Sequence, residues 1–162
     1  MAKKKIPVTP ALRALNQAGL KYEPREYAYQ DHGGTRVASQ AIGLEEHAVV
    51  KTLVMVDASG GALIVLMHGD REVSTKGLAR VLGKKSIAPA GPKEVTRLTG
   101  YQVGGTSPLG TRKKLPVYVE ETILDLDRIV VNGGRKGLLV ELDPRELGRV
   151  LGWTPVKVGL ES

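Results

Sequence analysis

Alternating hydrophobic and polar positions predict two consecutive strands near the middle of the chain. The octapeptide VVKTLVMV begins at Val49, and the apolar run Ala62–Met67 follows it after the turn sequence DASGG. Side chains alternate between the two faces of a strand, so Lys51 shares its face with Leu53 and Met55. The two runs together predict a β-hairpin with a lysine inside an aliphatic strand.

Helix signals recur along the rest of the chain. In the first predicted helix Thr9 is the N-cap, Pro10 is the first helical residue and Gly19 follows the end. The same pattern, with a glycine just past each end, predicts four more helices: Thr35–Ile42, Ser74–Leu82, Pro92–Thr99 and Pro144–Leu151. Further β-rich runs are Val117–Val119, Ile129–Val131 and Leu138–Leu142.

A second hairpin is predicted at NGG, Asn132–Gly134, because Asn and Gly accept the positive φ of tight turns. Two hairpins imply antiparallel pairing, and strands and helices do not alternate strictly. We therefore expect an α+β fold with a mixed, mainly antiparallel sheet and surrounding helices. With no internal repeat and no long linker, residues 1–162 are expected to form one domain.

The charge balance favours a polyanionic partner. The chain has 24 Lys and Arg against 17 Asp and Glu, a formal net charge of +7. Basic residues gather at Lys3–Lys5, Lys84–Lys85, Arg112–Lys114 and Arg135–Lys136. Each cluster alone is typical of a solvated loop, but together they favour nucleic acid. Aromatic residues make up only 4% of the chain, so contact to phosphates fits better than stacking on bases.

Several classes of site are disfavoured. The chain has no cysteine, which excludes disulfides, thiolate metal sites and a cysteine nucleophile and suits a reducing compartment. No apolar run approaches the roughly 20 residues of a membrane helix, and the start lacks a signal peptide's apolar region. We expect a cytoplasmic protein without membrane contact. HExxH and GxSxG are absent, and His32, His47 and His68 match no metal template. These histidines are expected at the surface or at helix ends, with no metal and no cofactor.

Lys51 allows two interpretations. In the first interpretation, its aliphatic stem lies along the apolar face and the ammonium group reaches water at a strand edge. The strand pattern alone favours this interpretation. Alternatively, the ammonium group points into a cleft, where apolar surroundings strengthen its field on an anionic or ester-bearing ligand.

A glycine-rich loop, YQVGGTSPLGTRKKLP, runs from Tyr101 to Pro116. Gly104 and Gly105 let the backbone approach a ligand closely, and exposed amides in such a loop can bind an oxyanion or a phosphate. The loop lacks the Gly-Lys-Ser/Thr ending of a nucleotide-binding loop, so a plain turn is the alternative. The adjoining basic residues Arg112, Lys113 and Lys114 are predicted to contact phosphates of a nucleic acid.

Three segments carry a family resemblance over nearly the whole chain. VVKTLVM, TGYQVGGTSPLGTRKKLP and VNGGRKGLLVEL, in this order and spacing, resemble the YbaK family of Cys-tRNA(Pro) deacylases, within the superfamily of prolyl-tRNA synthetase editing domains. The resemblance implies a partly barrel-like editing-domain fold. It also implies a trans-editing hydrolase that acts beside prolyl-tRNA synthetase and cleaves the ester of mischarged tRNA(Pro).

The resemblance implies roles for particular residues. Lys51 would hold the aminoacyl end as the catalytic residue. The residues implied to bind substrate are Tyr27, Thr52, Gly104, Gly105, Thr106, Ser107, Pro108, Asn132, Gly133 and Gly134. In this family the thiol of the substrate cysteine attacks its own carbonyl, so the enzyme needs no nucleophile of its own.

The sequence departs from the family pattern at three positions. Asn132 stands where the best-known members have serine, Leu139 where they have aspartate, and Gly34 where an aromatic residue is expected. These departures leave open a deacylase for alanine or another small residue on tRNA(Pro). A non-catalytic basic module that binds tRNA or a synthetase is the alternative from another class, but it would not need Lys51 or the glycine loop.

Overall fold

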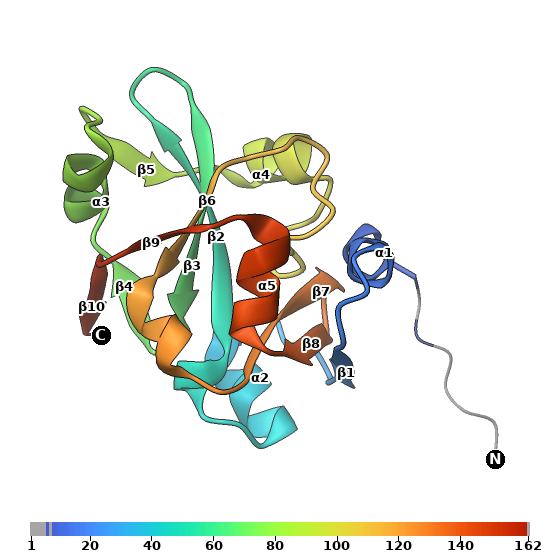
Figure 1. Cartoon of the computed structure of the whole chain (residues 1–162). Coiled ribbons are helices and arrows are strands. Elements are labelled where there is room, and N and C mark those ends of the chain that lie inside the picture. The colour runs from blue at the N-terminus through green and yellow to red at the C-terminus, as the bar shows by residue number, and fades with distance from the viewer. Residues whose placement is uncertain (1–5, 7, 162) are drawn as a thin grey trace, which may run out of the picture.

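The computed structural model of the chain describes Ile6 and residues 8–161, and a long hairpin forms its centre (Figure 1). The hairpin consists of β2 (Val50–Asp57) and β3 (Ala62–His68), paired without a register shift. This confirms the first predicted hairpin. The basic cluster Lys3–Lys5 lies outside the described residues.

The hairpin belongs to a five-stranded sheet in the order β5-β2-β3-β6-β9. The added strands are β5 (Ile87–Pro89), β6 (Val117–Glu120) and β9 (Thr154–Val156). β5 pairs with β2 antiparallel, whereas β6 pairs with both β3 and β9 in parallel. The sheet is therefore mixed, as predicted.

Two smaller antiparallel sheets complete the β structure. One has the order β1-β8-β7, from β1 (Glu23–Glu26), β8 (Leu138–Leu142) and β7 (Ile129–Arg135), and the other pairs β4 (Arg71–Val73) with β10 (Gly159–Glu161). An isolated parallel bridge, Val49 to Val130, joins β7 to the start of β2. The α+β architecture is confirmed, and over the part of the chain that the structure describes the strands do not close into a barrel.

The predicted turn at Asn132–Gly134 is wrong, because these residues lie within β7. The Asn132 side-chain oxygen accepts hydrogen bonds from the amides of Gly134 (2.7 Å) and Arg135 (3.1 Å). This local bonding produces a bulge, seen as a register shift between Asn132 and Arg135. The turn itself is Lys136–Gly137, where Gly137 supplies the positive φ of 82°.

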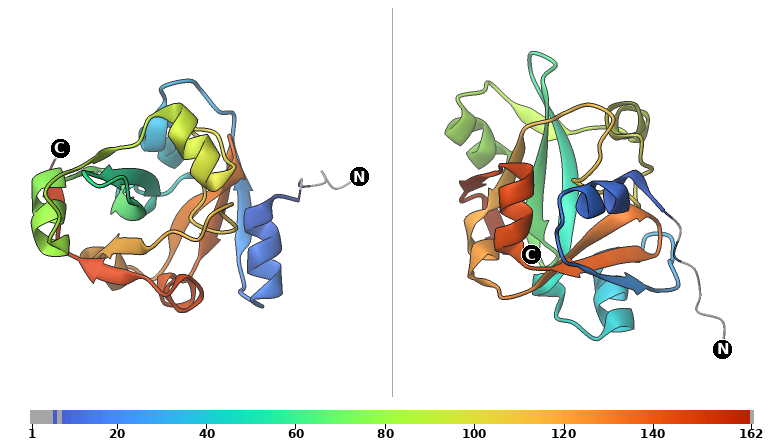
Figure 2. Two further views of the ribbon diagram at one scale, coloured as in Figure 1. Left: turned by 90° about the horizontal axis from the view of Figure 1, so that it is seen from above. Right: turned by 45° about the vertical axis from the view of Figure 1, so that its right-hand side comes forward.

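All five predicted helices are confirmed. They are α1 (Pro10–Gln17), α2 (Gly34–Ile42), α3 (Thr75–Leu82), α4 (Pro92–Thr99) and α5 (Pro144–Leu151). α1 and α3 lie at opposite ends of the molecule in Figure 1 and in the left-hand view of Figure 2. Two short 3-10 helices, η1 (Glu46–Ala48) and η2 (Glu121–Asp125), were not predicted. Within the described ranges no helix is long and apolar enough to cross a bilayer.

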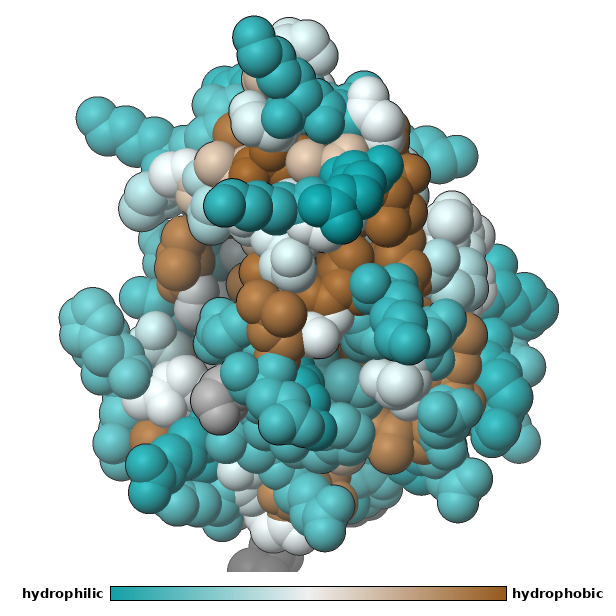
Figure 3. Space-filling view, turned by 90° about the vertical axis from the view of Figure 1, so that its left-hand side faces the viewer, coloured by the Kyte–Doolittle hydropathy of each residue, from teal (hydrophilic) through white to brown (hydrophobic). Residues whose placement is uncertain are grey.

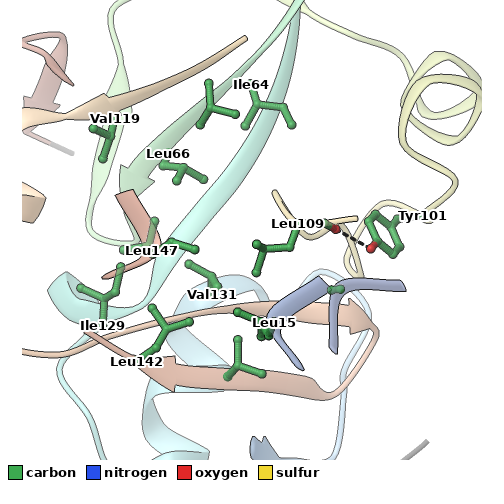
Figure 4. Close-up of a cluster of buried hydrophobic side chains, with 14 of the residues drawn as sticks. Leu15, Ile64, Leu66, Tyr101, Leu109, Val119, Ile129, Val131, Leu142 and Leu147 are labelled. Carbon is green, nitrogen blue, oxygen red and sulfur yellow. Dashed lines mark hydrogen bonds between the residues drawn. The ribbon is translucent and has the colours of Figure 1, made fainter. Parts of the chain in front are cut away.

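Two hydrophobic cores lie on opposite faces of the β2–β3 hairpin. Ile64 and Leu66 of β3 face the larger core, which fills the space toward β7 and β8 (Figure 4). Val65 and Met67 face the smaller core, where Leu78 of α3 covers them. The β3 side chains from Leu63 to His68 are therefore all buried, and the hairpin is held from both sides. Figure 3 shows the α3 side of the molecule, where hydrophilic side chains surround a more hydrophobic area.

The prediction that the histidines lie at the surface or at helix ends is wrong for His68, whose relative exposure is 1%. Its Nδ1 lies 2.7 Å from the His47 carbonyl oxygen and its Nε2 lies 2.7 Å from the Thr122 hydroxyl. The His68 ring stacks on the His47 ring with centroids 3.7 Å apart, and His47 Nδ1 lies 2.8 Å from an Asp70 carboxylate oxygen. His68 thus ties the end of β3 to η1 and η2.

We predict that His68 makes the folded state less stable in mild acid. Burial lowers the pKa of His68, and proximity to His47 lowers it too, although the hydrogen bond to the His47 carbonyl opposes this. In the unfolded chain the histidine side chain binds a proton at about pH 6.5. Above that pH the free energy of unfolding therefore has its full value, and it decreases as the pH falls toward the lower pKa that His68 has in the folded state. Urea unfolding measured at a series of pH values should show this decrease.

The variant His68→Gln should lack this part of the pH dependence, whereas His32→Gln should keep it because His32 is exposed. The same decrease in His68→Gln as in the wild type would contradict the assignment.

Candidate functional site

The outer edge of β2 is only partly covered by neighbouring strands. β7 meets it at the Val49–Val130 bridge, and β5 begins to pair with it at Met55. Between these points no strand among the described residues pairs with that edge. The Val54 carbonyl accepts from the Ala90 amide (2.9 Å), and alternation along the strand points the Thr52 peptide group to the same side.

A cavity of about 720 Å³ lies along this open edge. Val49 and the consecutive β2 residues Val50–Met55 line it, because it wraps around both faces of the exposed edge. Its other walls come from the segment after β1, α2, β4, the start of α3, β5, α4, the glycine-rich loop and the β7–β8 hairpin. Leu139 and Ala38 make part of the lining apolar.

Lys51 lines this cavity, and its side chain is 19% exposed. Its ammonium nitrogen donates to the Arg71 carbonyl oxygen (2.6 Å) and lies 3.6 Å from a Glu72 carboxylate oxygen. An ammonium group has three donors, so Lys51 keeps hydrogen-bonding capacity beyond the Arg71 contact. The location at the cavity supports the cleft interpretation of Lys51.

Thr52 has a buried hydroxyl oxygen without a hydrogen-bond partner, and the residue lines the same cavity. An unpaired buried hydroxyl is costly, roughly 1–3 kcal/mol, and such groups are uncommon in folded proteins.

The glycine-rich loop reaches the cavity through Gly104 and Thr106. Gly104 has φ +90° and packs so closely against the Tyr29 hydroxyl that a Cβ would collide with it. Asn132, which also lines the cavity, donates its side-chain amide to the Gly104 carbonyl (3.3 Å). Asn132 therefore links the loop to the β7 bulge.

Five of the predicted substrate-binding residues do not line the cavity: Gly105, Ser107, Pro108, Gly133 and Gly134. A Cβ on Gly105 would lie 2.7 Å from the Lys136 amide nitrogen, so the loop packs against the β7–β8 turn at this point. The Ser107 hydroxyl accepts from the Leu109 amide (3.2 Å), and Ser107 and Pro108 are buried. A Cβ would also clash with neighbouring side chains at two positions of the bulge, Gly133 and Gly134.

The basic residues Arg112, Lys113 and Lys114 are exposed and lie outside the cavity lining. The Arg112 and Lys113 amides donate to the Thr99 and Leu98 carbonyls at the end of α4. The structure thus brings together Tyr27, Lys51, Thr52, Gly104, Thr106 and Asn132, and places the three basic residues apart from them.

Tyr27 and Tyr29 form the wall that follows β1. Burial raises the pKa of Tyr27, and the neighbouring Tyr29 raises it further. The Tyr27 phenol therefore stays protonated at neutral pH and can donate a hydrogen bond into the cavity. The Tyr27 amide is fixed by a 3.0 Å hydrogen bond to the Gly137 carbonyl.

The residue analysis missed several side chains that line the cavity. Lys136 lies over the Tyr29 ring, with its nitrogen 5.2 Å from the ring centroid, and brings a second ammonium group to the lining. Lys136 was missed because the turn was predicted at Asn132–Gly134, before the turn that contains Lys136. His32, with φ 61°, also lines the cavity, together with Asp31 and Glu72.

The wall formed by α2 depends on contacts with Gly69. The Thr35 hydroxyl donates to the Glu46 carboxylate (2.6 Å) and lies 3.2 Å from the Gly69 carbonyl. A Cβ on Gly69 would lie 2.6 Å from the Glu46 carbonyl and 2.7 Å from the Val49 carbonyl. Three segments therefore meet at Gly69 without room for a side chain.

One group of residues resembles a metal site in composition. Potential ligand atoms of His47, His68 and Asp70 all lie within 4.8 Å of one another. Both ring nitrogens of His68 already have hydrogen-bond partners, and the two imidazole rings are stacked rather than directed at a common point. This arrangement suits a structural hydrogen-bonding role.

We predict that Thr52→Val increases the stability of the ligand-free protein by up to about 1 kcal/mol, because valine keeps the shape and removes the unpaired hydroxyl. Urea unfolding without ligand measures the effect. Thr106→Val is the matched control and should lose about 1 kcal/mol, because the Thr106 hydroxyl donates to the Gln102 carbonyl (3.0 Å). Equal destabilisation by both substitutions would refute the assignment of an unpaired hydroxyl.

The chain is similar in sequence to known proteins. The sequence pattern that defines the aminoacyl-tRNA editing domain matches residues 34–150. EbsC of Enterococcus faecalis, a candidate Cys-tRNA(Pro)/Cys-tRNA(Cys) deacylase, is 33% identical over 149 residues, which cover 91% of each chain. The proline–tRNA ligase of Thermodesulfovibrio yellowstonii is 27% identical over 114 residues, 70% of this chain but 18% of the ligase.

A solved structure shows the same architecture. The crystal structure of a candidate trans-editing enzyme for prolyl-tRNA synthetase matches with a TM-score of 0.82 and 29% identity, over 95% of this chain and 99% of that one. The matched pattern includes the open edge of β2, Lys51 and the glycine-rich loop. The chain therefore belongs to the family of aminoacyl-tRNA editing domains.

Proposed function

We propose that the protein is a trans-editing deacylase that hydrolyses mischarged aminoacyl-tRNA, with Cys-tRNA(Pro) as its substrate. The observation that carries this proposal is the cavity at the open edge of β2, which is lined by both Lys51 and Thr52, the residue with the unpaired hydroxyl, in an editing-domain chain. The similarity to EbsC supports cysteine as the amino acid removed.

Lys51 is the proposed catalytic residue. One of its three donors is engaged by the Arg71 carbonyl, which fixes the ammonium group at the cavity wall. A remaining donor can reach the ester or the terminal ribose of the tRNA. Negative charge that develops on the ester oxygen is stabilised by a positioned cation in surroundings that exclude water.

The substrate-binding assignments divide into two groups. Tyr27, Thr52, Gly104, Thr106 and Asn132 line the cavity and are proposed to contact the aminoacyl end directly. The remaining residues of the two glycine motifs are proposed to act by keeping the loop and the bulge in place: Gly105, Ser107, Pro108, Gly133 and Gly134.

The proposed chemistry uses a nucleophile from the substrate. The chain has no cysteine, and the Ser107 hydroxyl is buried and bonded to the Leu109 amide. The substrate thiol attacks its own ester carbonyl, and the bond between the carbonyl carbon and the terminal ribose oxygen breaks. The ribose oxygen leaves with the thiol proton, giving uncharged tRNA and a cyclic thiolactone. Such intramolecular attack benefits from a high effective concentration.

The proposed reaction implies two partners, tRNA(Pro) and prolyl-tRNA synthetase. Arg112, Lys113 and Lys114 are exposed and are proposed to contact phosphates of tRNA(Pro). Prolyl-tRNA synthetase is the proposed protein partner, supported by the match to a segment of a proline–tRNA ligase. Since its substrate is made in the cytoplasm, we propose that the protein acts there.

A second candidate substrate is tRNA(Pro) charged with alanine. Leu139, Ala38 and Val49 form an apolar part of the cavity. An apolar wall suits a methyl side chain as well as a thiol, so this lining favours alanine as the alternative.

We predict that Lys51→Ala lowers kcat/KM for Cys-tRNA(Pro) by at least about 100-fold, because the positioned cation is lost. The free energy of unfolding should change by less than about 1 kcal/mol, since Lys51 is partly exposed and its removal opens no large core cavity. Single-turnover deacylation and urea unfolding measure the two quantities. Lys21→Ala, on an exposed residue, should leave both unchanged. Near-normal turnover in Lys51→Ala would return Lys51 to the role of a solvated strand residue.

We predict that cysteine, serine and alanine esters of the same tRNA(Pro) react at very different rates. Serine is nearly the same shape as cysteine but is a weaker nucleophile, so Ser-tRNA(Pro) should bind comparably and react at least about 100-fold more slowly. Rate measurements, with product analysis by mass spectrometry, test this. Equal rates for cysteine and alanine, with free amino acid as the first product, would show that water is the nucleophile.

A further inference from the structure

A second hollow, with a volume of about 450 Å³, lies on the side of α3. Four cationic side chains line it: Lys76 and Arg80 from α3, and Lys84 and Lys85 from the segment between α3 and β5. We call this hollow the α3 groove. Figure 3 shows the molecule from the α3 side, with hydrophilic side chains projecting from the surface.

Most of the positive charge in the groove is not neutralised within the protein. Lys84 lies 3.5 Å from an Asp57 carboxylate oxygen. Hydrogen bonds from Ser59 hold the pKa of Asp57 at about 2, so this carboxylate stays ionised. Lys76, Arg80 and Lys85 are exposed, and none has a carboxylate within ion-pair distance among the residues that the structure describes.

The α3 groove adjoins the cavity. Thr75, the first residue of α3, lines both hollows. A chain that leaves the cavity over Thr75 would therefore meet the α3 cations at once. The basic residues Arg112–Lys114 follow α4, and α3 and α4 lie at opposite ends of β5 in Figure 1. Arg112–Lys114 line neither hollow.

We propose that the α3 groove binds the RNA backbone next to the aminoacylated end of the tRNA. This inference rests on the proposed function, because it takes the aminoacyl end to occupy the cavity. Phosphate oxygens fit a groove whose lining combines four cations with hydroxyl groups. An acidic protein partner is less favoured, because the centre of a protein interface is usually apolar and aromatic, and the groove lining contains no aromatic ring.

The double variant Arg80→Ala/Lys85→Ala tests this inference in the full-length protein. Its matched control is Arg13→Ala/Lys21→Ala, which also removes two exposed positive charges, near α1 at the far end of the molecule (Figure 1). Affinity for uncharged tRNA(Pro) is measured by fluorescence anisotropy over a series of salt concentrations. Hydrolysis of Cys-tRNA(Pro) is compared with hydrolysis of the cysteinyl ester of adenosine, which has no phosphate to reach the groove.

The groove variant should bind tRNA at least about tenfold more weakly, and the slope of log affinity against log salt should become shallower by about 2. KM for Cys-tRNA(Pro) should rise while kcat and the hydrolysis of cysteinyl-adenosine stay unchanged. The control variant should match the wild type in every measurement.

Other outcomes separate the two proposals. If the wild type deacylates and the two double variants bind tRNA equally, the groove inference is overturned and the proposed function stands. If the wild type binds tRNA through the groove but does not deacylate, the proposed function fails alone. If the groove variant keeps its affinity for tRNA and loses affinity for prolyl-tRNA synthetase, the groove is a protein interface and the inference is overturned.

Discussion

β2 has a complete hydrogen-bonded partner on one side and an incomplete one on the other. Pairing with β3 holds the strand along its length, and side chains from two cores pack against the two faces of this hairpin. On the other side, β7 and β5 each reach β2 near only one of its ends. β7 and β5 therefore leave a wedge-shaped space between them along this edge of β2. The cavity occupies this wedge, so Lys51 and Thr52 are displayed from a rigid strand rather than from a mobile loop.

The C-terminal residues help to hold Lys51 in place, although they do not contact it. The Lys51 ammonium group is held by the carbonyl of Arg71 in β4. β4 in turn pairs with β10, and the following Ser74 amide donates to the Val158 carbonyl (2.8 Å). Glu120, which is buried, accepts hydrogen bonds from the Val158 and Gly159 amides (2.7 Å each). A chain of hydrogen bonds thus connects β6 through the C-terminal segment to the acceptor of Lys51.

Sequence patterns were sufficient where the deciding interactions are local. A glycine just past the last turn indicated the end of all five helices, and side-chain N-caps are present in α1, α3 and α5. Alternation defined the β2–β3 hairpin and the face of Lys51. The strands missed are three or four residues long, too short for alternation to be recognised, and they exist because distant segments pair with them. The bulge at Asn132 and the burial of His68 also depend on contacts made only in the folded chain. For the same reason Lys136 could not be assigned to the cavity from sequence.

The crowding at Gly69 has a consequence for how such a chain can change during evolution. Backbone atoms of Glu46 and Val49 surround the place where a side chain would begin, so even a methyl group would displace the segments that frame the cavity. Ala38 and Leu139, by contrast, border the cavity itself, where a side chain of another size meets empty space rather than backbone. Substitutions at lining residues can therefore change the shape of the cavity, while the segments packed around Gly69 keep their positions. A lineage can acquire preference for a new acyl group through lining residues without passing through unfolded intermediates.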